Sequence, residues 1–172
     1  MASKKLPYRP GDLFAVPLRC GGFAAGVAAR ADGRGTVLCY FFGPRRDDLP
    51  TTDDVGELRG EDAVEIAMFG DLGLIEGRWP VIGPLPDWKS ENWPVPGFGR
   101  IDVVSGNRVW RVRYQDPDLK WLSEEEIDLS EAAALPKDRL MGAGAVERWL
   151  SHLLDRDPSP GISARSSAPA RA

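Results

Sequence analysis

Three apolar runs near the amino-terminal end, separated by short glycine-rich gaps, constrain this chain more than any other feature. The runs cover residues 12–18, 23–31 and 36–43, and the gaps read RCGG and DGRG. β-Branched, aromatic and small apolar residues dominate the runs, which favours strands. Glycine reaches the positive φ that a tight reversal requires. The pattern therefore predicts a three-stranded antiparallel meander.

The rest of the chain adds shorter strands and one helix. Further strands are expected at residues 64–69, 77–83, 100–105 and 108–115, the last two joined by a turn at 105–107. Pro80 cannot donate to a sheet ladder, so its strand should be an edge strand or contain a bulge. Apolar residues recur at helical spacing near the other end, which predicts an amphipathic helix over 143–155. We expect a mainly β (α+β) fold, an antiparallel twisted sheet or partly open barrel with this helix packed on it.

Two connecting segments have unusual compositions. Residues 44–63 are polar, acidic and rich in turn formers, with a short helix expected to open at Thr52, where a hydroxyl can cap the helix start. Residues 84–99 hold four prolines and two tryptophans. This segment should be a long loop whose aromatic side chains either fill the core or form a surface site.

The length of 172 residues fits one domain with short unstructured ends. We expect a flexible leader over residues 1–10, a single folded domain over 11–156 and a disordered tail over 157–172, which is rich in proline, serine, alanine and arginine. No apolar run suits a membrane span or a signal peptide, which predicts a cytoplasmic protein without a membrane partner.

The usual catalytic constellations are missing from the sequence. The chain has one histidine, His152, and two cysteines, Cys20 and Cys39, without CxxC spacing, whereas zinc hydrolases need several imidazole or thiolate ligands. There is no GxSxG, and the glycine-rich gaps lack the spacing of a phosphate-binding loop. We therefore predict no catalytic, cofactor-binding or metal-binding residues. The net charge of −4 also disfavours nucleic acid as a direct partner.

Acidic residues are concentrated in two places. The first acidic segment, residues 47–65, holds eight acids against Arg59 alone, and the second, residues 116–131, holds seven against Lys120 alone. Both can be solvated surfaces that keep the protein soluble, or either can be a surface that attracts a basic partner. The candidate partner-binding residues, taken from these segments and from the tryptophan loop, are Asp47, Asp48, Asp53, Asp54, Glu57, Glu61, Asp62, Trp88, Trp93, Glu124 and Glu125.

Three stretches together resemble the immunity protein 26 family: GDLFAVPL at 11–18, FAAGVAAR at 23–30 and GRWPVIG at 77–83. The resemblance implies an all-β fold and a bacterial protein that binds and neutralises a cognate toxin of a polymorphic toxin system, without catalysis. A basic nuclease is one candidate for that toxin, and the oligomeric state stays open. The residues that carry the resemblance, which we expect to be structural, are Gly11, Asp12, Phe14, Pro17, Gly26, Gly77, Trp79, Pro80 and Gly83.

Two alternatives come from other functional classes. The family label is sometimes joined to phosphotriesterase activity, which implies an organophosphate hydrolase; such chemistry usually relies on a metal-activated water held by several histidines. The other alternative is a small adaptor that binds a peptide between Trp88, Trp93 and Phe98. Exposure of the two tryptophans side by side would favour the adaptor, and their burial in the core would count against it.

Overall fold

The computed structural model describes residues 5–155, which form nine strands in two sheets. The larger sheet contains β1 (Asp12–Pro17), β2 (Phe23–Ala31), β3 (Thr36–Arg46), β4 (Glu65–Gly70), β5 (Val81–Pro84) and β9 (Leu140–Met141). The smaller sheet contains β6 (Phe98–Asp102), β7 (Arg108–Tyr114) and β8 (Trp121–Glu126). The helices are α1 (Thr52–Val55), α2 (Leu72–Ile75), α3 (Leu129–Ala133) and α4 (Ala143–Asp155), with 3-10 turns η1 (Gly60–Asp62) and η2 (Ser90–Asn92). None of the helices in this range has the length and apolar character needed to cross a membrane.

The six-stranded sheet has the order β5-β1-β2-β3-β4-β9. Its strands pair antiparallel except for β4 and β9, and β1, β2 and β3 form the predicted meander. As predicted from Pro80, β5 lies at the edge of the sheet. Its register with β1 shifts between Leu13 and Phe14. The strand begins at Val81 and not at Gly77, because the Gly77 and Trp79 amides donate back to carbonyls of α2.

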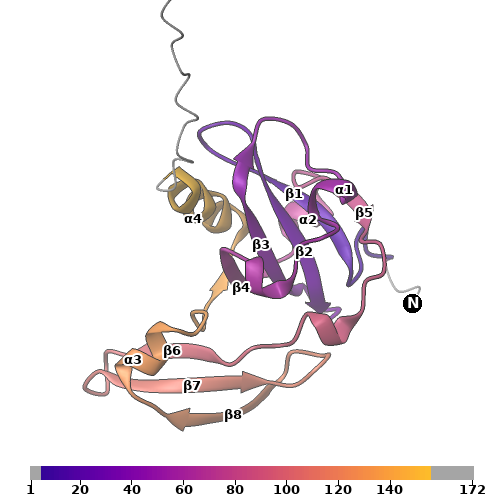
Figure 1. Cartoon of the computed structure of the whole chain (residues 1–172). Helices are drawn as coiled ribbons and strands as arrows, with labels where there is room; N and C mark the ends of the chain where they lie inside the picture. Colours follow the sequence, from indigo (N-terminus) through magenta and orange to yellow (C-terminus); the bar gives the residue numbers. More distant parts are fainter. Residues whose placement is uncertain (1–4, 156–172) are drawn as a thin grey trace, which may run out of the picture.

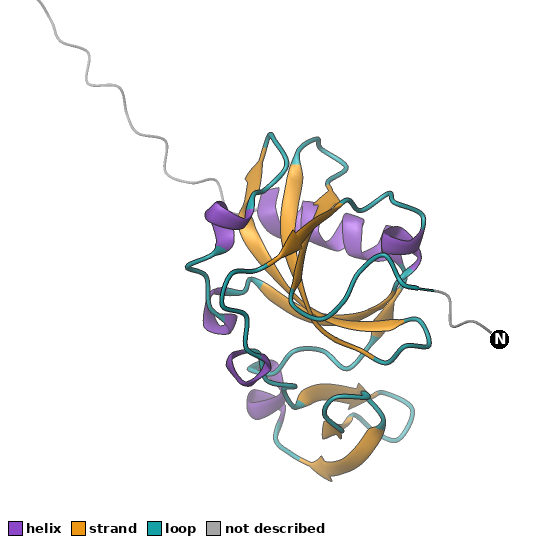
Figure 2. Cartoon of the chain, turned by 90° about the vertical axis from the view of Figure 1, so that its right-hand side faces the viewer, coloured by secondary structure: helices purple, strands orange, loops and turns teal. Residues whose placement is uncertain are grey.

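Both faces of the larger sheet are buried. Helix α4 lies across one face (Figure 2), where Val146 and Leu150 join a core that includes Phe14 and Phe41. The opposite face carries a second core that includes Tyr40, and it is covered by Trp93 from the proline-rich loop and by residues of the smaller sheet. Strands covered on both sides read as nearly continuous apolar runs. This double burial explains the three runs that dominate the sequence.

The smaller sheet lies as a separate layer beside the six-stranded body (Figure 1). Strands β6 and β7 form the predicted hairpin, whose turn contains Gly106 and Asn107 at positive φ. Strand β8, which pairs with β7, and helix α3, which contacts β6 and β7, were not predicted. The fold class is confirmed as mainly β with a carboxyl-terminal helix, and both sheets are open.

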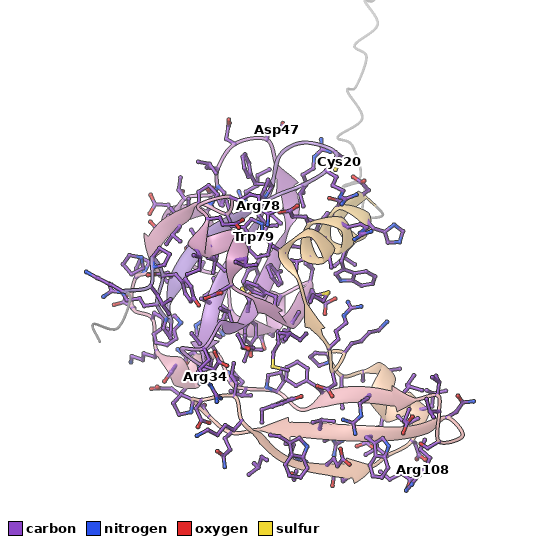
Figure 3. The ribbon with its side chains drawn as sticks, turned by 180° about the vertical axis from the view of Figure 1, so that it is seen from behind. Cys20, Arg34, Asp47, Arg78, Trp79 and Arg108 are labelled. Carbon is purple, nitrogen blue, oxygen red and sulfur yellow. The ribbon has the colours of Figure 1, made fainter. Side chains whose placement is uncertain are left out.

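Packing accounts for most of the motif residues. Gly26 pairs with Phe14 across β1 and β2, and a Cβ at Gly26 would lie 2.5 Å from the Phe14 ring. That ring stacks on Trp79 at 5.8 Å between centroids, and the Trp79 Nε1 donates to Glu147 at 2.8 Å. Figure 3 shows Trp79 inside the body of the molecule. Gly11 has φ +94° and lies against Trp88, where a Cβ would approach the indole to 2.9 Å.

The remaining motif residues lie at strand ends and turns. Asp12 is buried and accepts a hydrogen bond from the Arg9 amide, while Pro17 ends β1 opposite Phe23. Gly77 and Gly83 have positive φ, and the Pro80 carbonyl accepts from the Ala15 amide. These positions shape the backbone around the core.

Two residues of the predicted leader, Leu6 and Tyr8, pack against the core of the body. The Tyr8 side chain is buried, and its hydroxyl donates to Asp71 at 2.8 Å. The tail predicted at 157–172 lies outside the described residues. The division into leader, domain and tail stays a prediction.

Candidate functional site

An open groove lies between the loop of residues 56–61 and the proline-rich loop of residues 85–96. Its cavity volume is about 1110 Å³. We call it the acidic groove, and its lining consists of Tyr40, Gly56, Glu57, Leu58, Arg59, Gly60, Glu61, Ile66, Leu85, Pro86, Asp87, Trp88, Asn92, Trp93, Pro94 and Pro96. The first acidic segment and the tryptophan loop, which the sequence suggested separately, therefore meet at one site.

Tyr40 of β3 holds the two loops together at the floor of the groove. Its hydroxyl donates to the Pro94 carbonyl, and its ring packs edge-on against Trp93 at 5.2 Å between centroids. Gly60 comes so close that a Cβ there would lie 3.0 Å from the Tyr40 ring. Burial raises the pKa of Tyr40 from 10 to about 12, so the phenol stays protonated and keeps its donor role even at moderately alkaline pH.

Arg30 of β2 fixes the proline-rich loop from below. The residue is only 4% exposed, and its guanidinium donates to the Trp93 and Ser90 carbonyls, each at 3.2 Å. The same group makes a bidentate pair with Asp116 at 2.6 and 2.7 Å, which lowers the pKa of that carboxyl. One buried side chain thus ties a groove wall and the segment after β7 to the larger sheet.

The charges at the groove are mainly negative. Glu57, Glu61 and Asp87 line it together with a single cation, Arg59. Glu57 and Glu61 are exposed and make no ion pair with any residue in the range 5–155. Asp87 adopts φ 52° in the turn at residues 86–87, a left-handed conformation that aspartate tolerates better than most residues. The groove therefore has carboxylates available for a partner.

Trp88 forms part of the wall and has an unsatisfied donor. The residue is half-buried, and its Nε1 is shielded from solvent without a hydrogen-bond partner among the residues that the structure describes. Buried indole N–H groups usually find an acceptor. Trp88 thus brings to the groove a partly exposed ring and an unsatisfied hydrogen-bond donor.

The other acids predicted in the first segment lie outside the groove lining. The Asp54 side chain accepts from the Thr51 amide at 2.7 Å and pairs with Arg46 at 3.3 Å, and the Thr51 hydrogen bonds lower the pKa of Asp54. Asp62 accepts from the Arg59 amide at 2.7 Å. Asp47, Asp48 and Asp53 are exposed, and Figure 3 shows Asp47 at the opposite end of the molecule from Arg108 of the smaller sheet.

Glu124 and Glu125 lie on β8 and face arginines of the other two strands of the smaller sheet. Glu124 pairs with Arg100 at 2.5 Å, and Glu125 pairs with Arg111 and with Arg113, the latter at 3.0 Å. Beside them, Arg108 pairs with Glu126 at 2.6 Å. These ion pairs neutralise much of the second acidic segment. The structure does not bring Glu124 and Glu125 to the groove, whose lining contains neither residue.

The aromatic residues proposed for an adaptor divide between the core and the surface. Trp93 is 5% exposed and Phe98 is fully buried, so both serve the core, and Trp93 also lines the groove. Only Trp88 keeps a partly exposed ring. This burial counts against an adaptor that uses all three aromatic side chains as anchors.

Sequence reasoning missed several groove residues. Tyr40 lies inside an apolar run and was assigned to a strand, and Leu58, Ile66 and Leu85 carry no local signal of a site. The hydroxyl of Tyr40 within an otherwise apolar strand was the one available hint. Within residues 5–155 no group of three or more histidine, cysteine, aspartate or glutamate residues is arranged to hold a metal ion.

Comparison with known proteins gives one match. The model of a family described as Immunity protein 26 matches residues 9–110, a range that contains every residue lining the acidic groove and ends before β8. No curated protein and no solved structure matches the chain.

Proposed function

The chain belongs to the immunity protein 26 family, and from this premise we propose that it protects its cell by binding a cognate toxin directly, without catalysis. The encounter would take place in the cytoplasm of the producing cell. Because an immunity protein of this kind acts by occupying a surface of the toxin, its essential feature is a binding site and not a reactive group.

The observation that carries the proposal is the acidic groove. Two separate loops converge there, and the carboxylates of Glu57 and Glu61 in the first loop are not used by ion pairs in the described part of the chain. Uncompensated charge at a binding site accelerates association with a partner of opposite charge. All of the lining lies inside the range that the family model matches.

A basic toxin surface is the partner that this groove favours. A nuclease presents lysine and arginine where it grips phosphate, and an acidic surface can occupy that region in place of the nucleic acid. Blocking it would neutralise the toxin although the immunity protein performs no chemistry.

Co-expression with the toxin domain encoded beside this protein tests the proposal. We expect the cells to survive and the two chains to purify together as a stable complex. Because charge steering weakens as salt screens it, the association rate should also fall with ionic strength. Survival without a complex, or no survival, would contradict protection by direct binding.

A further inference from the structure

We propose that the acidic groove receives an extended segment of the toxin and holds a lysine or arginine side chain between Trp88 and the carboxylates of Glu57 and Glu61. This inference rests on the proposed function and specifies the chemistry of the bound partner. Four features of the groove support it: its size, its charge, its aromatic lining and its unsatisfied donor.

The groove is large enough and open enough to admit a segment of polypeptide. Its volume of about 1110 Å³ lies just above the roughly 300–1,000 Å³ that is typical of small-molecule clefts, and it is open to solvent between two loops. An extended segment can lie along such a groove with alternate side chains pointing into it.

The charge of the lining selects a cation. The lining contains three carboxylates, at Glu57, Glu61 and Asp87, and one guanidinium, at Arg59. Phosphate groups or acidic side chains would be repelled by this arrangement, whereas lysine or arginine would gain charge-assisted hydrogen bonds. Charge complementarity therefore favours a basic segment over an acidic or nucleotide ligand.

An aromatic ring strengthens the preference for a cation. Of the three aromatic residues in the lining, Trp88 is the one whose ring is partly exposed, since Tyr40 and Trp93 are 2% and 5% exposed. The faces of such rings attract ammonium and guanidinium groups, and the effect grows as water is excluded. Carboxylates next to aromatic rings are thus suited to both parts of a long basic side chain, its apolar stem and its charged end.

The Trp88 indole N–H is a hydrogen-bond donor for the backbone of the bound segment. This N–H is buried without a partner in the described part of the chain, which costs free energy. Because the donor is shielded from solvent in the free protein, it reaches a carbonyl oxygen of the bound segment only if the Trp88 ring moves when the segment binds. Binding would then satisfy a donor that the free protein leaves unpaired.

Site-specific photocrosslinking in the toxin complex tests where and what the groove binds. Benzoylphenylalanine would be placed at Pro86, an exposed residue of the lining, and, as a control, at the exposed Leu72 outside the groove. We expect crosslinking from position 86 to a toxin segment that contains lysine or arginine, and none from position 72. A crosslinked segment without a basic residue, or equal crosslinking at both positions, would overturn the inference.

A peptide with the sequence of the crosslinked segment, and a copy with glutamine in place of its basic residues, would then measure the charge preference. We expect Glu57→Gln/Glu61→Gln to weaken binding of the basic peptide by roughly tenfold or more. The glutamine peptide should bind the parent protein and this variant equally weakly. The matched control is Asp48→Asn/Asp53→Asn, which removes two exposed acids outside the lining. Equal affinity of the two peptides would overturn the inference.

The two proposals can fail separately. If no complex with the toxin forms, the proposed function fails. If a protective complex forms but neither crosslinks at Pro86 nor depends on Glu57 and Glu61, immunity by direct binding stands and the assignment of the groove is wrong.

Discussion

The two acidic segments look alike in the sequence but differ in the structure. In the second segment, the glutamates of β8 face arginines of β6 and β7, and Asp116 is bound by the buried Arg30. In the first, Glu57 and Glu61 line a groove without an ion pair to any described residue. Figures 1 and 3 show that the smaller sheet, with Arg108, is a separate layer from the body.

This difference teaches that acidic density along a chain does not measure the charge available to a partner. The arginines that neutralise β8 lie on other strands, so only the strand register reveals the compensation. Cross-strand pairs of opposite charge stabilise a sheet, whereas unpaired carboxylates are free to steer association. We therefore propose a structural role for the second segment and a binding role for Glu57 and Glu61 of the first.

The largest expected effect is the loss of Arg30. The Arg30→Met substitution removes the bidentate pair with Asp116 and leaves the Ala29 and Trp93 carbonyls without their donor. We expect the free energy of unfolding, measured by urea denaturation, to fall by about 2–4 kcal/mol. Asp116→Asn should cost less, about 1 kcal/mol, because the 51% exposed position screens the lost charge and the Arg30 guanidinium keeps its carbonyl acceptors. An Arg30→Met variant as stable as the parent would contradict the structural role.

A smaller effect should appear on acidification. Arg30 lowers the pKa of Asp116 below its ordinary value of 3.8 in the folded state. The pair therefore contributes its full stability above that value and loses it as the pH falls through the lower, folded-state pKa. The difference in unfolding free energy between the parent and Asp116→Asn should shrink below pH 3.8. A difference that stays constant down to pH 2 would show that the ion pair is not its source.

Charge reversal on β8 should destabilise the protein modestly. Glu124→Lys/Glu125→Lys places lysines next to Arg100, Arg111 and Arg113. We expect a lower midpoint of urea denaturation that added salt partly restores, because salt screens repulsion between exposed charges. Glu57→Lys/Glu61→Lys is the matched control, and its midpoint should stay unchanged. Equal loss of stability in both variants would remove the distinction between the segments.

Much of the fold could be predicted because its signals are local. The meander follows from glycine-rich gaps between apolar runs, the edge position of β5 follows from Pro80, and α4 has the bounds that its periodicity predicted. Strand β8 was not predicted because polar and apolar residues do not alternate in WLSEEE and all six of its residues are exposed. Its pairing depends on arginines elsewhere in the chain. The two-residue β9 is too short to leave a pattern.

The groove could be predicted only in parts. The acids and the tryptophan loop stood out by composition, but nothing local indicated that they meet. Their meeting depends on Tyr40, whose hydroxyl binds the Pro94 carbonyl, and on Arg30, whose guanidinium binds the Ser90 and Trp93 carbonyls. Such contacts join segments distant in sequence, so they are properties of the tertiary structure.

The most direct measurement compares the rates at which the toxin associates with two variants that have the same net charge, Glu57→Lys/Glu61→Lys and Glu124→Lys/Glu125→Lys. Stopped-flow mixing at low ionic strength separates a local charge effect from an overall one. We predict that the groove variant associates roughly tenfold or more slowly than the parent, while the β8 variant stays within about twofold. Equal rates for the two variants would contradict the account.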